Sequence, residues 1–246
     1  NVINFIRKEN SNKNIKIQSL ENSIKDVTSL LNSIDYDLSR YKFYSQIKKG
    51  LINFELETQF ELKKQNNFSY NISGNIKDGN FNLIGLNNLD KINFDFKIEK
   101  NISEITNLNF NYQNVMLNSE KIKIIKEKSG SYDLKGDIKN NKALINPKLL
   151  FKFANFKQDY LSNEDILLET KNSFSFKLDS KNKIKNFKIE SIINFDEIYF
   201  NNKYQNIVFL KKGKIISKYE RNQFIADLSS NFDFINQKYK NDEYKY

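Results

Sequence analysis

Apolar and polar residues alternate strictly between Leu51 and Leu62. The even positions from Ile52 onward are apolar, apart from one threonine, whereas the odd positions from Asn53 to Glu61 are polar or charged. Successive side chains of a β-strand point to opposite faces of its sheet. The period of two therefore predicts a strand with one apolar face and one hydrated face.

The same alternation recurs along the rest of the chain and predicts on the order of a dozen short strands separated by polar turns. Asp78-Gly79 is a dipeptide typical of two-residue hairpin turns, so we expect a hairpin there. After Pro147, the apolar cluster from Leu149 to Phe156 predicts a short helix or an irregular crossover. Regular strand spacing favours a barrel, a sandwich or an extended antiparallel meander over βαβ units.

Residues 1–50 follow a different period. Apolar residues recur there at helical steps of three and four, and Ser19 is a suitable N-cap. We therefore expect one N-terminal amphipathic helix, packed on the sheet and ended by a turn at Gly50. This predicts a helix-containing segment, 1–50, followed by an antiparallel β segment, 51–246. The apolar positions of the expected helix are Leu20, Ile24, Val27, Leu30, Leu31 and Ile34.

The composition narrows the possible partners. With 39% hydrophobic and 14% aromatic residues, the 246-residue chain has enough apolar side chains to form a core. The net charge of +10 indicates either a surface for nucleic acid or anionic lipid, or a solvated lysine-rich exterior. Single-strand binders interleave aromatic and cationic side chains, whereas here the two kinds lie on opposite strand faces. We therefore predict no nucleic-acid partner.

Catalysis is not expected. The chain has no cysteine and no histidine, which removes the usual activated nucleophiles and most transition-metal sites. Glu55, Glu57 and Glu61 share the polar face of one strand, a pattern typical of solvated carboxylates rather than an acid–base pair. We predict no enzyme activity, no metal and no cofactor.

The apolar strand faces allow two interpretations. They form either an ordinary closed core or a curved surface that holds acyl chains. Hydrocarbon needs only dry, non-directional contact, which contributes about 25 cal/mol per Å² buried, so such a site requires no polar motif. The alternation alone leaves both interpretations open.

The stretch from about Leu51 to Ile145 resembles the AsmA-like family of bacterial envelope proteins, in particular its YhdP- and TamB-like members. The resemblance is carried by the alternating segment 52–62, by Tyr-Asn-Ile-Ser-Gly-Asn-Ile at 70–76 and by Ile-Asn-Phe-Asp-Phe-Lys-Ile at 92–98. Phe-Asn-Tyr at 110–112, followed by Leu-Asn-Ser at 117–119, and Tyr-Asp-Leu-Lys-Gly-Asp-Ile at 132–138 add to it.

This resemblance implies a mainly β chain whose long antiparallel meander forms a curved, groove-like sheet. It further implies a periplasmic segment of a larger protein, anchored in the inner membrane by a part not present here. Its groove would bind and conduct phospholipid between the inner and outer membranes. The alternative is a structural or adhesive envelope protein with a closed core and no ligand. The expected lining residues are Ile52, Phe54, Leu56, Phe60, Leu62, Phe68, Tyr70, Ile72, Ile92, Phe94, Phe96 and Ile98.

Overall fold

A computed structural model describes residues 2–7, 12–27, 47–61, 68–82, 88–147, 164–181, 183–200 and 206–236. The chain is mainly β. Its strands are β1 (Val2–Arg7), β2 (Asn12–Ser23), β3 (Ile47–Glu61), β4 (Phe68–Asn82), β5 (Asn88–Glu99), β6 (Ile102–Tyr112), β7 (Val115–Lys126), β8 (Tyr132–Ile145), β9 (Ile166–Leu178), β10 (Ile184–Phe200), β11 (Asn206–Glu220) and β12 (Gln223–Asn236).

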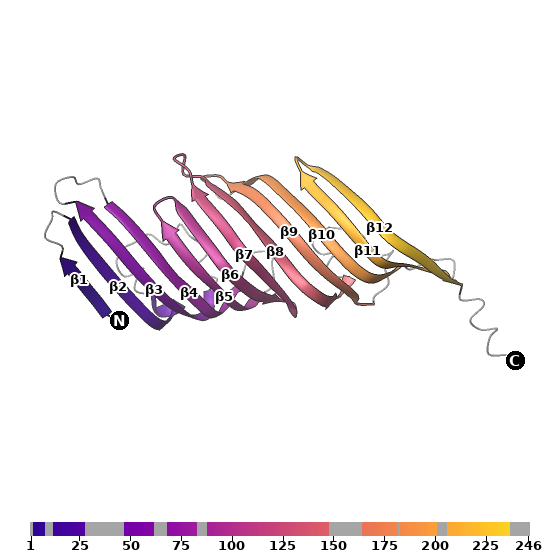
Figure 1. The fold of residues 1–246 in the computed structure, drawn as a ribbon, viewed down its shortest axis with the longest axis horizontal. Helices are drawn as coiled ribbons and strands as arrows, with labels where there is room; N and C mark the ends of the chain where they lie inside the picture. The colour runs from indigo at the N-terminus through magenta and orange to yellow at the C-terminus, as the bar shows by residue number, and fades with distance from the viewer. Residues whose placement is uncertain are drawn as a thin grey trace. The chain divides into compact units, whose positions relative to one another are not determined.

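The strand order in the sheet is the order in the chain, from β1 to β12 (Figure 1). Every consecutive pair from β1 to β7, and from β10 to β12, is antiparallel. The predicted antiparallel meander is therefore confirmed. The chain divides into two compact units: unit 1 comprises residues 1–137 and 175–185, and unit 2 comprises residues 138–174 and 186–246.

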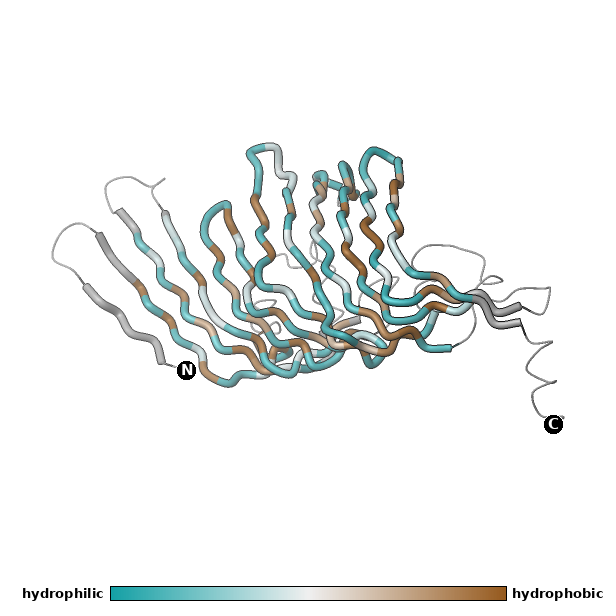
Figure 2. Tube along the Cα trace, turned by 45° about the vertical axis from the view of Figure 1, so that its right-hand side comes forward, coloured by the Kyte–Doolittle hydropathy of each residue, from teal (hydrophilic) through white to brown (hydrophobic). Residues whose placement is uncertain are grey.

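Most strands of unit 1 contain one residue that interrupts the alternation. These residues have positive φ values: Glu21 (50°), Gly50 (143°), Asp78 (49°), Lys91 (52°) and Asn107 (53°). Register shifts accompany the first four of them. They are β-bulges, in which one extra residue reverses which side chains, odd-numbered or even-numbered, point to a given face of the sheet. Figure 2 shows hydrophilic and hydrophobic residues alternating along the strands.

The expected hairpin at Asp78-Gly79 is wrong, because both residues lie inside β4. The expected turn at Gly50 is wrong for the same reason, since Gly50 lies inside β3. A bulge needs a residue that tolerates positive φ, just as a tight turn does, so the two features share a local signature.

The expected N-terminal helix is also not supported where the structure describes it. Residues 19–23 belong to strand β2, and only 24–27 form a helical turn. The bulge at Glu21 explains the misleading spacing, because the parity switch after Leu20 imitates a helical step. Leu30, Leu31 and Ile34 lie outside the described residues, as does the cluster from Leu149 to Phe156.

Apart from β1, the strands are 11–17 residues long and thus longer than expected. Strand β10, for example, contains Phe187, Ile189, Ile198 and Phe200 in one continuous segment. Tight turns instead occur at Gln113-Asn114 and Arg221-Asn222, where all four residues have positive φ. This conformation matches a type I′ hairpin without the usual glycine.

Candidate apolar binding face

One face of unit 1 carries continuous rows of apolar side chains. Directly opposed residues of paired strands point to the same side of a sheet. The registers from β2 to β7 therefore align Ile17, Leu56, Ile72, Ile98, Ser103 and Ile124 in one row. We call this side of unit 1, on strands β2–β7, the apolar face.

A second row runs beside the first, with Ser19, Phe54, Gly74, Phe96, Ile105 and Ile122 opposed in turn. Gly74 lies between two phenylalanines, and a Cβ atom there would be 2.9 Å from both Phe54 Cα and Phe96 Cζ. The glycine thus lets the Phe96 ring lie against the backbone of β4, a device that protects glycines within sheets. Phe94 extends the aromatic surface, its ring centroid 6.2 Å from that of Phe96.

On the far side of each bulge, the apolar face is formed by the alternate set of residues of the strand: odd-numbered where it was even-numbered before, or the reverse. Leu89 of β5, Tyr112 of β6 and Val115 of β7 are opposed in register and only 5–9% exposed. The row that contains Ile72 is half-buried instead. The bulges therefore keep apolar side chains on one side of the sheet along the full strand length.

The bulges are tied to neighbouring strands by asparagine side chains. Asn53 Oδ1 accepts a hydrogen bond from the Glu21 backbone N–H at 2.5 Å, and Asn93 Oδ1 accepts one from the Asp78 N–H at 3.1 Å. Asn93 Nδ2 also donates to the carbonyl of Lys91 at 2.8 Å. Asparagine therefore satisfies backbone donors that the interrupted ladder leaves free.

The opposite face of unit 1 is charged and ion-paired. Lys16 Nζ lies 2.7 Å from Glu55 Oε1, and Gln18 Nε2 donates to Glu55 Oε2 at 2.7 Å. Lys121 Nζ lies 2.7 Å from Glu104 Oε1. Hydrogen bonding to the lysine lowers the pKa of each of these two glutamates. They are therefore ionised partners on a hydrated surface, not proton-sharing carboxylates.

Nine of the predicted lining residues have described side chains, all on the apolar face: Ile52, Phe54, Leu56, Tyr70, Ile72, Ile92, Phe94, Phe96 and Ile98. Phe60 and Phe68 are opposed register positions of β3 and β4, whereas Leu62 lies outside the described residues. A ligand-lining role for the set remains a prediction.

Other residues of the face were missed, namely Ile17, Ile105, Ile122 and Ile124. Ile15 and Ile17 alternate with lysine and glutamine, a strand signal that the helical spacing after Ser19 obscured. Ile105 was missed because the bulge at Asn107 changes the parity of β6 before Leu108.

The apolar face is buried in part: Leu89 and Ile92 are at most 9% exposed, whereas Phe54, Leu56 and Ile72 are half-buried. No described hydrophobic side chain is less than 2% exposed. Ile24, in the helical turn beside β3, is 3% exposed, and its Cδ1 would lie 2.8 Å from a Cβ at Gly50. Two buried hydroxyls on the face, of Thr58 and Ser119, have no hydrogen-bond partner among the described residues. The face thus combines apolar rows with two buried hydroxyls that have no hydrogen-bond partner among the described residues.

A shallow depression of about 460 Å³, lined by Leu20, Glu21, Asn53 and Asn75, lies at the bulges on the polar side. Within the described ranges, no group of three or more acidic residues is arranged to hold a metal ion. In the same ranges, no helix is long and apolar enough to cross a membrane.

No family model, curated protein or solved structure matches this chain.

Proposed function

We propose that the apolar face of unit 1 binds the acyl chains of phospholipids and gives them a path along the sheet. This role is binding and transfer, without a chemical step. The observation that supports it most is the continuity of the two apolar rows from β2 to β7.

The dimensions of the rows suit an acyl chain. Six strands at the usual spacing of about 4.8 Å give a row about 24 Å long. One leaflet of a bilayer contributes about half of a hydrocarbon core about 30 Å thick. A single acyl chain laid across the strands would therefore contact apolar side chains over most of its length.

The chemistry of the face also suits a lipid. Each CH₂ group moved from water onto an apolar surface contributes about 0.8 kcal/mol, with no directional requirement. Adjacent rows from Phe54 and Leu56 offer such a surface without interruption by charge.

The resemblance to AsmA-like proteins extends this proposal to location. A periplasmic segment, held at the inner membrane by its parent protein, would pass phospholipid toward the outer membrane. Acyl-chain binding by the apolar face does not depend on that location and is tested separately.

The test is native mass spectrometry of the full chain purified from bacteria, followed by lipid extraction. We expect phospholipid to co-purify at reproducible stoichiometry and to be lost from Phe54→Asp, because a carboxylate would interrupt the second row and place a charge beside the first. Gln59→Asp is the matched control, since it places the same side chain at an exposed position on the opposite face of the same strand. It should retain the lipid.

Circular dichroism and thermal unfolding distinguish loss of binding from loss of the fold. A folded Phe54→Asp variant without lipid supports the proposal. A lipid-free wild-type protein whose Phe54→Asp variant unfolds globally would contradict it and indicate a closed core instead.

A further inference from the structure

Three turns of unit 1, which join β5 to β6, β7 to β8 and β9 to β10, lie at the same end of its strands. The Lys126 backbone N–H donates a hydrogen bond to the Asn101 carbonyl at 2.8 Å, which connects the first turn to the second. Lys177 Nζ lies 2.5 Å from Glu127 Oε2, which connects the second turn to the end of β9. We call residues 97–101, 126–133, 177–181 and 183–185 the basic rim.

The basic rim has a surplus of lysine, because its carboxylates are used within the rim itself. Glu99 Oε1 lies 2.7 Å from Lys97 Nζ. Asp179 Oδ1 accepts hydrogen bonds from the backbone N–H groups of Lys181 and Lys183, both at 2.9 Å. The eight lysines of the rim are Lys97, Lys100, Lys126, Lys128, Lys177, Lys181, Lys183 and Lys185, and its four carboxylates are Glu99, Glu127, Asp133 and Asp179.

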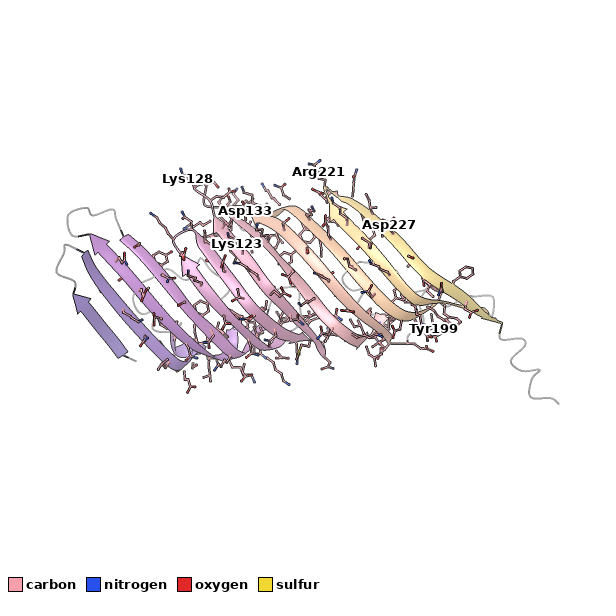
Figure 3. The ribbon with its side chains drawn as sticks, viewed as in Figure 1. Lys123, Lys128, Asp133, Tyr199, Arg221 and Asp227 are labelled. Atoms are coloured by element: carbon pink, nitrogen blue, oxygen red, sulfur yellow. The ribbon has the colours of Figure 1, made fainter. Side chains whose placement is uncertain are left out.

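Five of these lysines are exposed and form no ion pair with a described carboxylate: Lys100, Lys126, Lys128, Lys181 and Lys183. Lys128, labelled in Figure 3, lies in the turn beyond the ends of β7 and β8. At the other end of β7, the two turn residues that connect it to β6 are Gln113 and Asn114, which carry no charge. The free positive charge therefore lies at one end of these strands.

The basic rim borders the apolar face. In the row of the face that contains Ile98, Ser103 and Ile124, these residues are opposed in register near the ends of β5, β6 and β7. Lys126 follows Ile124 by two residues within β7, so both side chains point to the same side of the strand. Lys100 follows Ile98 by the same step, just beyond the end of β5. At about 3.3 Å per residue, each lysine Cα is about 7 Å from that row.

We propose that the basic rim binds the phosphate of anionic phospholipids whose acyl chains lie on the apolar face. This inference rests on the acyl-chain binding proposed above and names the class of lipid. A lipid whose chains lie on the row with Ile98 and Ile124 would place its phosphate beside Lys100 and Lys126. Lysine ammonium groups bind phosphate as point charges and are attracted to anionic lipids. A zwitterionic headgroup, whose own cation offsets the phosphate charge, would bind less tightly.

Single-stranded nucleic acid is another polyanion that a lysine-rich surface can attract. Proteins that bind it place aromatic side chains among the cationic ones, so that bases stack on the rings. Residues 100–101, 127–131 and 179–183, which lie between the strands, include no aromatic residue and no arginine. The border with apolar rows therefore fits a lipid phosphate better than a nucleic-acid strand.

The test measures which lipid the full chain selects. The chain, freed of lipid, is incubated with vesicles that contain equal amounts of phosphatidylglycerol and phosphatidylcholine with identical acyl chains. The vesicles are then removed by flotation, and the lipids bound to the protein are identified by native mass spectrometry. Wild type should hold at least ~5-fold more phosphatidylglycerol than phosphatidylcholine, because lysines beside the headgroup favour the anionic lipid.

Removal of two rim lysines makes the test specific. The double variant Lys100→Gln with Lys126→Gln should bring the ratio of the two lipids close to one, while the total amount of bound lipid stays the same. The matched control is Lys49→Gln with Lys77→Gln, which removes the same charge at exposed positions of β3 and β4 outside the rim. The control should keep the preference of wild type.

Equal amounts of the two lipids on wild type, or an unchanged ratio in the rim variant, would overturn the rim proposal and leave acyl-chain binding in place. Wild type without any bound lipid would contradict acyl-chain binding, and the rim proposal with it. Binding of a fluorescent single-stranded oligonucleotide that is lost only in the rim variant would also overturn the proposal, by assigning the rim to nucleic acid.

Discussion

At the residue scale, a few positions with unusual backbone or contacts determine how the sheet is built. Glycine is required at position 74 because a Cβ there would clash with the carbonyl oxygen of Asn53, and would also crowd Phe54 Cα and the ring of Phe96. At position 78 the backbone is left-handed, with φ near 49°, a conformation that aspartate tolerates and β-branched residues do not. Neither residue would touch an acyl chain directly, but both shape the face that would.

Gly74→Ala should destabilise the protein, because the added Cβ would lie 2.9 Å from both Phe54 Cα and Phe96 Cζ. Overpacking of this kind costs about 1–3 kcal/mol. Urea unfolding of Gly74→Ala measures the loss. Ser73→Ala, one residue earlier and on the other face, is the control and should change the unfolding free energy little. Equal stability of the two variants would show that β3 and Phe96 do not approach the backbone of β4 this closely.

Asp78→Val should lower the free energy of unfolding by about 1–2 kcal/mol, the usual cost of a left-handed conformation in an L-residue with a bulky side chain. Asp78→Asn should be nearly neutral, because asparagine adopts this conformation readily. Chemical unfolding of both variants tests the bulge. If the Asp78→Val variant were as stable as the Asp78→Asn variant, residue 78 would not have a positive φ in solution.

A polar cluster at the β7–β8 turn gives a test based on pH. Glu127 Oε2 accepts hydrogen bonds from Lys177 Nζ at 2.5 Å and Ser131 Oγ at 2.7 Å. The hydrogen bond from Lys177, followed by those from Ser131 and Asp133, lowers the pKa of Glu127 from 4.5 to about 2. Hydrogen bonding to Glu127, and then burial, raises the pKa of Asp133, which is labelled in Figure 3.

The two carboxyl groups should therefore respond to pH in opposite ways. Glu127→Gln should lower Tm at pH 7, and the difference from wild type should vanish as pH falls from about 4.5 to 2, where wild-type Glu127 becomes protonated. Asp133→Asn should raise Tm at pH 7 by removing a charge beside Glu127, and this gain should vanish below the raised pKa of Asp133. Thermal melts across this pH range measure both effects. A pH-independent difference for either variant would contradict the assignment.

At the element scale, the alternation predicted most of the strands but not their boundaries. Leu56, Ile72 and Phe96 could be assigned to one apolar face because the period of two survives in each strand segment. The bulges could not be predicted from the same pattern. A parity switch looks like a turn when it falls on Asp78-Gly79 and like a helix when it falls between Leu20 and Ile24. The register that joins the strands into rows depends on pairing across the sheet, which a single sequence does not encode locally.

At the scale of the whole molecule, the two faces of unit 1 differ in chemistry. One face carries the apolar rows from β2 to β7, and the opposite face is charged and ion-paired. This separation is the basis for proposing acyl-chain binding.

The most direct test of the apolar face is site-specific photocrosslinking to phospholipid. A benzophenone amino acid is placed singly at positions 54–57 of β3, and at positions 76, 77, 80 and 81 of β4, in the full chain. Lipid contact on one face predicts crosslinks at 54 and 56 but not at 55 and 57. Across the bulge at Asp78 the parity should switch, with crosslinks at 76 and 81 but not at 77 and 80. Crosslinks at positions on both faces of the strands, or no crosslinks at 54 and 56, would contradict lipid binding by the apolar face.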